Sequence, residues 1–70
     1  MPNSVYKVIQ VVGSSPTSWE EAARTAVEEA SQHLTDLRIA EVEKFDLRVE
    51  DGKIAAYRVK LNLSFRYQPG

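Results

Sequence analysis

The sequence predicts an α+β domain of the order β-α-β-β, a three-stranded antiparallel sheet wrapped around one amphipathic helix. Three observations predict it. One stretch repeats apolar residues at intervals of three and four, the period of a helix. Two strand-like stretches are joined by an Asp-Gly pair, the strongest short signal for a hairpin. A third stretch, rich in β-branched residues, precedes the helix. With 70 residues, the chain predicts a single domain over residues 1–70.

The first strand is predicted over residues 5–12, where β-branched residues dominate and the alternation of polar and apolar residues is weak. Both of its faces carry apolar side chains, so we expect both to be partly covered. Residues 13–17 (GSSPT) are then predicted to end the strand and turn the chain into the helix.

The helix is predicted over residues 18–34. Ser18 and Glu21 fit a capping box, in which each side chain satisfies a free backbone N–H. We expect Trp19 to fill the core and His33 to favour the helix dipole. The apolar stripe is mostly alanine, so a flat sheet can approach closely. Its members are Trp19, Ala22, Ala23, Ala26, Val27, Ala30 and Leu34.

The hairpin is predicted to pair a second strand, residues 37–50, with a third strand, residues 54–67. Asp51-Gly52 is expected to form its two-residue turn, and residues 68–70 a tail. Within the second strand the apolar positions change from even to odd numbers. This change predicts a β-bulge near Glu43-Lys44.

The predicted hairpin is much longer than the predicted helix. At 1.5 Å per residue the helix covers about 25 Å, whereas the strands reach about 45 Å at 3.3 Å per residue. Tyr57, Phe65 and Tyr67 would then form an exposed apolar patch of a kind that soluble monomers avoid. We therefore expect self-association, for which closed symmetry is the usual form.

The composition excludes several functional classes. There is no cysteine and only one histidine, so disulfides, thiolate metal sites and histidine-rich metal sites are not expected. The net charge of −1, with both signs mixed, argues against a nucleic-acid partner. No apolar run is long enough to span a membrane, and no signal peptide is recognisable, so a cytoplasmic location is expected. No catalytic constellation is present, which argues against an enzyme.

Three segments, VYKVIQVVGSSPTSWEEAA, LRIAEVEKFD and YRVKLNLSF, resemble the dodecin family. The resemblance covers residues 4–67 with essentially no gaps. It implies a hollow homododecamer, a shell of twelve subunits with 23 symmetry, that binds and stores small ligands. In many dodecins the ligands are pairs of flavins, riboflavin or FMN, at the two-fold axes.

The same resemblance implies a ligand pocket at Arg38, Ile39 and Arg58. Flavin-binding dodecins have a tryptophan in place of Ile39, which stacks on the flavin, and a glutamine in place of Arg58, which hydrogen-bonds the ring edge. Many bacterial members have an aspartate in place of Arg38. Because both principal flavin contacts are replaced, flavin is disfavoured as the ligand. Arg58 is expected either to pair with a neighbour's carboxylate or to bind an anion, the first being favoured.

The segment SPTSWEEAA, with Ile39 in place of the tryptophan, is more similar to the calcium-binding dodecins of actinobacteria. Calcium takes about six to eight oxygen ligands, so symmetry-related copies would have to share a site. No EF-hand pattern is present. Asp46, Glu50 and Asp51, near the end of the hairpin, are the candidate ligands. The expected function is calcium binding and sequestration; a flavin store and a purely structural particle without ligand are the alternatives.

Overall fold

A computed structural model describes residues 3–67, so the first two residues and the predicted tail lie outside the described part. It has four elements, β1 (Tyr6–Ser15), α1 (Trp19–Ser31), β2 (Leu37–Glu50) and β3 (Lys53–Arg66). This is the predicted order, and the bounds of β2 are those predicted. No helix within residues 3–67 is long and apolar enough to cross a membrane.

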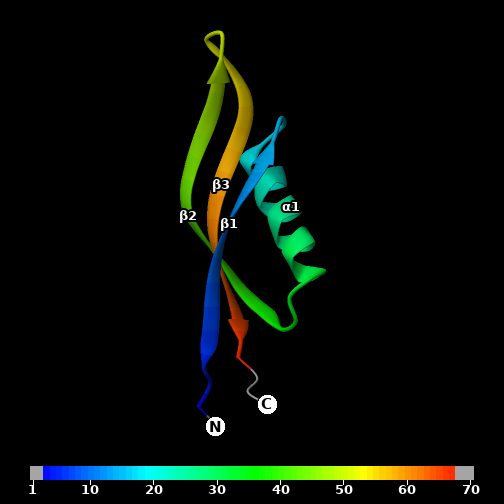
Figure 1. The fold of residues 1–70 in the computed structure, drawn as a ribbon. Helices are drawn as coiled ribbons and strands as arrows, with labels where there is room; N and C mark the ends of the chain where they lie inside the picture. Colours follow the sequence, from blue (N-terminus) through cyan, green and yellow to red (C-terminus); the bar gives the residue numbers. More distant parts are fainter. Residues whose placement is uncertain (1–2, 68–70) are drawn as a thin grey trace.

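The three strands form one antiparallel sheet in the order β1-β3-β2, with β3 in the centre. Figure 1 shows α1 beside the sheet and the β2–β3 hairpin extending well beyond it. The chain is accordingly elongated, with extents of 52 × 20 × 17 Å. We call the side of the sheet that packs on α1 the helix face and the opposite side the outer face.

The core lies between α1 and the helix face of β3. Ala22, Val59, Leu61 and Leu63 form its fully buried centre. The apolar side chains packed around this centre are only partly buried: Ile9, Val11, Ala23, Ala26, Val27, Ala30, Leu34 and Leu37. The alanine stripe therefore lies against the flat sheet, as the sequence predicts.

The strand β1 continues through Gly13 to Ser15, where the sequence predicted a turn. That prediction was wrong because these residues still pair with β3: Gly13 lies opposite Val59, and Ser15 opposite Tyr57. Gly13 is also where the strand and α1 approach most closely. A Cβ atom there would lie 2.2 Å from the carbonyl oxygen of Ala22.

The helix start is only partly the predicted capping box. The Ser18 hydroxyl does accept a hydrogen bond from the N–H of Glu21, at 3.0 Å. The carboxylate of Glu21, however, accepts from the hydroxyl of buried Ser15, at 2.7 Å, rather than from Ser18. Ser15 can donate this hydrogen bond because β1 continues to Ser15 and places its hydroxyl beside the start of the helix.

The helix ends at Ser31, three residues earlier than predicted. The next N–H groups, of Gln32 and His33, bond to carbonyls three residues back, which tightens the chain into a turn. Asp36 then takes a positive φ of 63°, which directs the chain into β2.

Trp19 does not fill the core of the chain, and that prediction was wrong. The residue is 37% exposed, and its ring packs edge-on against Phe45 and Tyr57, with centroid distances of 5.5 and 5.3 Å. Its indole N–H donates to the carbonyl of Asp46, at 3.2 Å. The physical reason is its position at the first turn of α1, over the hairpin rather than over the buried part of β3.

The hairpin confirms the predicted turn and the predicted bulge. Asp51 and Gly52 both have positive φ, 53° and 73°, as a type I′ turn requires. The register shifts between Val42 and Lys44, so Glu43 is the inserted residue. Two further shifts, around Arg38 and between Arg48 and Val49, were not predicted.

Large apolar side chains remain exposed on the chain, although not all of those predicted. Tyr57 and Phe65 are half-buried, Tyr57 because Trp19 packs against it, whereas Tyr67 is exposed. More of the exposed apolar surface comes from β1 and the residue before it, from β2 and from the hairpin end. It comprises Val5, Tyr6, Val8, Val12, Ile39, Val42, Phe45, Leu47, Val49 and Ile54.

Candidate functional site

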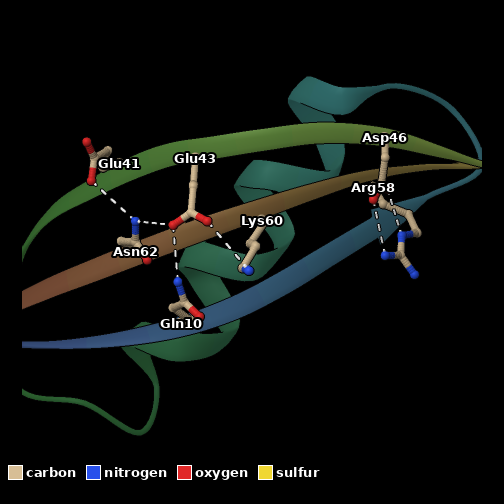
Figure 2. Close-up of polar contacts among 7 residues, drawn as sticks. All are labelled: Gln10, Glu41, Glu43, Asp46, Arg58, Lys60 and Asn62. Carbon is tan, nitrogen blue, oxygen red and sulfur yellow. Dashed lines mark hydrogen bonds and ion pairs between the residues drawn. The ribbon is translucent and has the colours of Figure 1, made fainter.

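A set of polar side chains crosses the outer face of the sheet (Figure 2). The strand register sets it up, because residues that lie opposite one another in neighbouring strands share a face. Gln10 in β1, Asn62 in β3 and Glu41 in β2 form one such row, and Arg58 lies opposite Asp46 in another. Lys60 and the bulged Glu43 lie between these rows. The outer face thus carries two polar groups, one centred on Glu43 and one on Arg58.

Glu43 connects all three strands. One carboxylate oxygen accepts from the side-chain amides of Gln10, at 3.1 Å, and Asn62, at 2.8 Å. The other lies 3.5 Å from the ammonium of Lys60. The hydrogen bond from Asn62 is the main cause that holds the pKa of Glu43 below its usual value, and the charge of Lys60 lowers this pKa further.

We expect this network to make stability depend on acid pH. Because the folded-state pKa of Glu43 is lower than its ordinary value of 4.5, the charged form stabilises the fold above that pH. The contribution is lost as the pH falls through the lowered pKa. In urea unfolding followed by circular dichroism, Glu43→Gln should have a lower midpoint than wild type at neutral pH. The two midpoints should converge in acid, and a gap independent of pH would contradict this role.

Arg58 and Asp46 form a two-pronged ion pair across β3 and β2. The Nε atom of Arg58 lies 2.8 Å from one oxygen of Asp46, and a terminal guanidinium nitrogen lies 3.3 Å from the other. This pairing lowers the pKa of Asp46 and raises that of Arg58. Of the two roles expected for Arg58, the structure shows carboxylate pairing, and the carboxylate belongs to the same chain.

The three pocket residues suggested by the family resemblance do not meet within one chain. Arg38, inserted at a register shift, pairs with Asp36 at 2.9 Å. Ile39 is exposed and lies opposite Ser64, six residues along β3 from Arg58. At 3.3 Å per residue, the separation along the strand is about 20 Å. A pocket containing all three therefore requires more than one copy of the chain.

The three candidate calcium ligands are likewise separate. Asp46 is held by Arg58, Glu50 pairs with Arg48, and Asp51 lies in the turn. Among residues 3–67, no group of three or more His, Cys, Asp or Glu side chains is placed to hold a metal ion. A calcium site that uses all three of these carboxylates would have to draw on neighbouring copies.

The network around Glu43 was not predicted from the sequence. The one available signal was the predicted bulge, because an inserted residue often re-aims a side chain. Nothing in the pattern indicated that Gln10 and Asn62, which are far apart in the chain, would donate to the same carboxylate oxygen.

Comparison with known proteins adds independent information. The sequence profile of the family described as Dodecin matches residues 5–68. A protein named calcium dodecin, from Mycobacterium tuberculosis, is 47% identical over 66 residues, which are 94% of this chain and 93% of that protein.

Solved structures are also similar. The dodecin from Streptomyces coelicolor superposes with a TM-score of 0.92 at 41% identity, covering 100% of both chains. The crystal structure of calcium dodecin from Mycobacterium tuberculosis, a calcium-chelating antigen, gives a TM-score of 0.82 at 50% identity and covers 96% of each chain.

Proposed function

The chain belongs to the dodecin family, and from that premise we propose that it is a homo-oligomeric binding protein that sequesters calcium. The observation that carries the proposal is its 47% identity, over nearly the whole of both chains, to a relative named for calcium. We propose a role in binding rather than in catalysis.

We propose that the assembly has twelve copies related by 23 symmetry. The support is the small buried centre of one chain, set against the large apolar side chains that it leaves exposed. A chain of this size gains little stability from burial alone. Covering the exposed side chains with other copies would supply the missing burial.

The chemical type of the three candidate metal-ligating residues suits calcium. Asp46, Glu50 and Asp51 are carboxylates, the hard oxygen donors that calcium prefers, and all three are exposed. No ion pair within residues 3–67 holds Asp51, so it is the most readily available of the three. Bound calcium would neutralise carboxylates that different copies bring together. We propose that these residues contribute to a site shared between copies.

Calcium should stabilise the assembled protein. One-site linkage gives about 2.7 kcal/mol when free calcium is a hundred times its dissociation constant. We expect a higher melting temperature in calcium than in chelator, with a smaller effect of magnesium, which holds its waters and requires stricter geometry. Overlapping melting curves in calcium, magnesium and chelator would reject calcium as the ligand and favour a purely structural particle.

The matched variant for this experiment is Asp51→Asn, which keeps the shape of the side chain and its tendency to accept a positive φ. It should reduce the calcium-dependent stabilisation and leave the melting temperature in chelator nearly unchanged. An unaltered calcium response would place the site away from the hairpin turn.

Flavin storage is the second candidate, and we expect flavin binding to be weak or absent. Ile39 cannot stack as an aromatic ring does, which forfeits about 0.5–1.5 kcal/mol beyond the buried area. Arg58 has no amide oxygen to accept from the flavin ring. The double variant Ile39→Trp with Arg58→Gln should gain quenching of riboflavin fluorescence. Quenching by wild type at nanomolar concentration would overturn this expectation.

A further inference from the structure

We infer that Arg58 is an anion-binding residue that Asp46 occupies from within the chain, so that Asp46 excludes ligands carrying phosphate. The inference extends the proposed function, because it rests on Arg58 belonging to the ligand pocket. It assigns Asp46 as the residue that sets the charge of the ligands accepted there.

The geometry of the pair supports this assignment. Asp46 receives two roughly parallel hydrogen bonds from Arg58, at 2.8 and 3.3 Å. Guanidinium groups bind phosphate oxygens with the same two-pronged arrangement. The carboxylate of Asp46 therefore takes the position that two phosphate oxygens would take. Figure 2 shows the pair on the outer face, apart from the network around Glu43.

The ion pair between Arg58 and Asp46 contributes little to the stability of the fold. Both side chains are nearly half exposed, Arg58 at 44% and Asp46 at 46%. Exposed ion pairs contribute little to folding, because water already solvates both charges well. An exposed pair can, however, decide whether the anionic group of a ligand is able to bind Arg58.

The fold also fixes the position of Asp46. The indole N–H of Trp19 donates to the backbone carbonyl of Asp46, at 3.2 Å. The Trp19 ring packs against Phe45 and Tyr57, the residues that precede Asp46 and Arg58. Each strand is thus held from the helix face directly beside its member of the ion pair. The backbone that carries the carboxylate is therefore held in place before any ligand arrives.

The neighbouring charges favour an anion once Asp46 is neutral. Lys44 lies directly opposite Lys60 in the adjacent row of the outer face, an arrangement that is unfavourable for like charges. Glu43 compensates Lys60, at 3.5 Å. Without the charge of Asp46, Lys44 and Arg58 would both remain available to an incoming phosphate. The ligand class expected after unmasking is a phosphate ester or a diphosphate.

The test compares wild type with Asp46→Asn, using inorganic pyrophosphate as the probe in buffer free of divalent cations. Binding is measured by calorimetry and by ³¹P line broadening. Asp46→Asn should bind pyrophosphate about tenfold more tightly than wild type, as expected for a released charged hydrogen-bonding group. The gain should diminish with added salt. Equal binding by wild type and variant would overturn the inference.

The control is the double variant Asp46→Asn with Arg58→Gln, in which the gain should disappear. A gain that persists there would place the anion on the neighbouring lysines and overturn the assignment of Arg58. Asp46→Ala serves as the second unmasking variant, with fold and assembly checked by circular dichroism and sedimentation.

The inference and the proposed function fail separately. Calcium sequestration is tested by melting curves of the wild-type protein, whereas the masking role is tested by pyrophosphate binding without calcium. If calcium does not change the melting temperature of wild type, and Asp46→Asn nevertheless gains affinity for pyrophosphate, only the calcium function is rejected. The opposite pair of results would reject only the masking role.

Discussion

Replacing Gly13 with alanine is expected to prevent α1 from packing on the sheet and to remove most of the stability of the chain. The added Cβ would lie 2.2 Å from the carbonyl oxygen of Ala22 and 3.0 Å from the Cβ of Ala26. The first contact is with helix backbone, which cannot move away as a flexible side chain can. Overpacking costs about 1–3 kcal/mol when neighbours can shift and more when they cannot. The midpoint of urea unfolding, followed by circular dichroism, measures the loss.

Gly52→Ala is the control for this experiment. A Cβ at Gly52 would meet no atom within 4 Å, so only the positive φ of 73° opposes the change. The left-handed backbone costs about 1–2 kcal/mol for an alanine. Gly13→Ala should therefore be clearly the less stable variant. Equal unfolding midpoints would show that the close approach of β1 and α1 is not what requires glycine at position 13.

Replacing the apolar pair at the end of the hairpin is expected to dissociate the assembly. Val49 and Ile54 lie opposite each other and are 59% and 51% exposed in the single chain. Because each side chain is already nearly half buried, completing its burial between copies would contribute about 1–1.5 kcal/mol per side chain. The double variant Val49→Lys with Ile54→Glu loses this contribution and would place charges in the interface. Sedimentation velocity should show a smaller particle than wild type, with a lower melting temperature.

The opposite charges in this variant make the experiment specific. The introduced lysine and glutamate would face each other within one chain, and such a cross-strand pair contributes about 0.2–1 kcal/mol to a hairpin. The hairpin itself should therefore be retained, and the loss would report on contacts between copies. A double variant that sediments like wild type would show that the hairpin end lies outside the interface. The apolar residues of β1 and of the β2 centre would then remain as the covered surface.

Much of the fold could be predicted because its signals are local. The alanine stripe depends on residues three and four positions apart, and the Asp51-Gly52 turn on two neighbours with positive φ. The bulge at Glu43 was visible as a change of phase within one strand. The element ends were less predictable, because the extension of β1 to Ser15 depends on pairing with β3.

The candidate site was less predictable, because two of its groups come together through long-range register. The family resemblance indicated Arg38, Ile39 and Arg58 as the residues of one ligand pocket. The structure separates Ile39 from Arg58 along the sheet. The network around Glu43 and the partner of Arg58 were both missed. The Glu43 network depends on the pairing of β1 with β3, which are far apart in the chain, and the partner of Arg58 depends on the register shifts within the β2–β3 hairpin.

The α+β class, the order of the elements, the hairpin turn and the family can all be recognised from the sequence. The pairing of Arg58 with Asp46 follows only from the three-dimensional register. Counting four residues away from the turn along each strand from the Val49–Ile54 pair, an unbroken ladder would place Arg58 opposite Phe45. The register shift between Arg48 and Val49 moves the partner by one residue, and the shift at Glu43 reverses it farther along. Because side chains alternate between faces, one inserted residue decides which charge a strand presents to its neighbour.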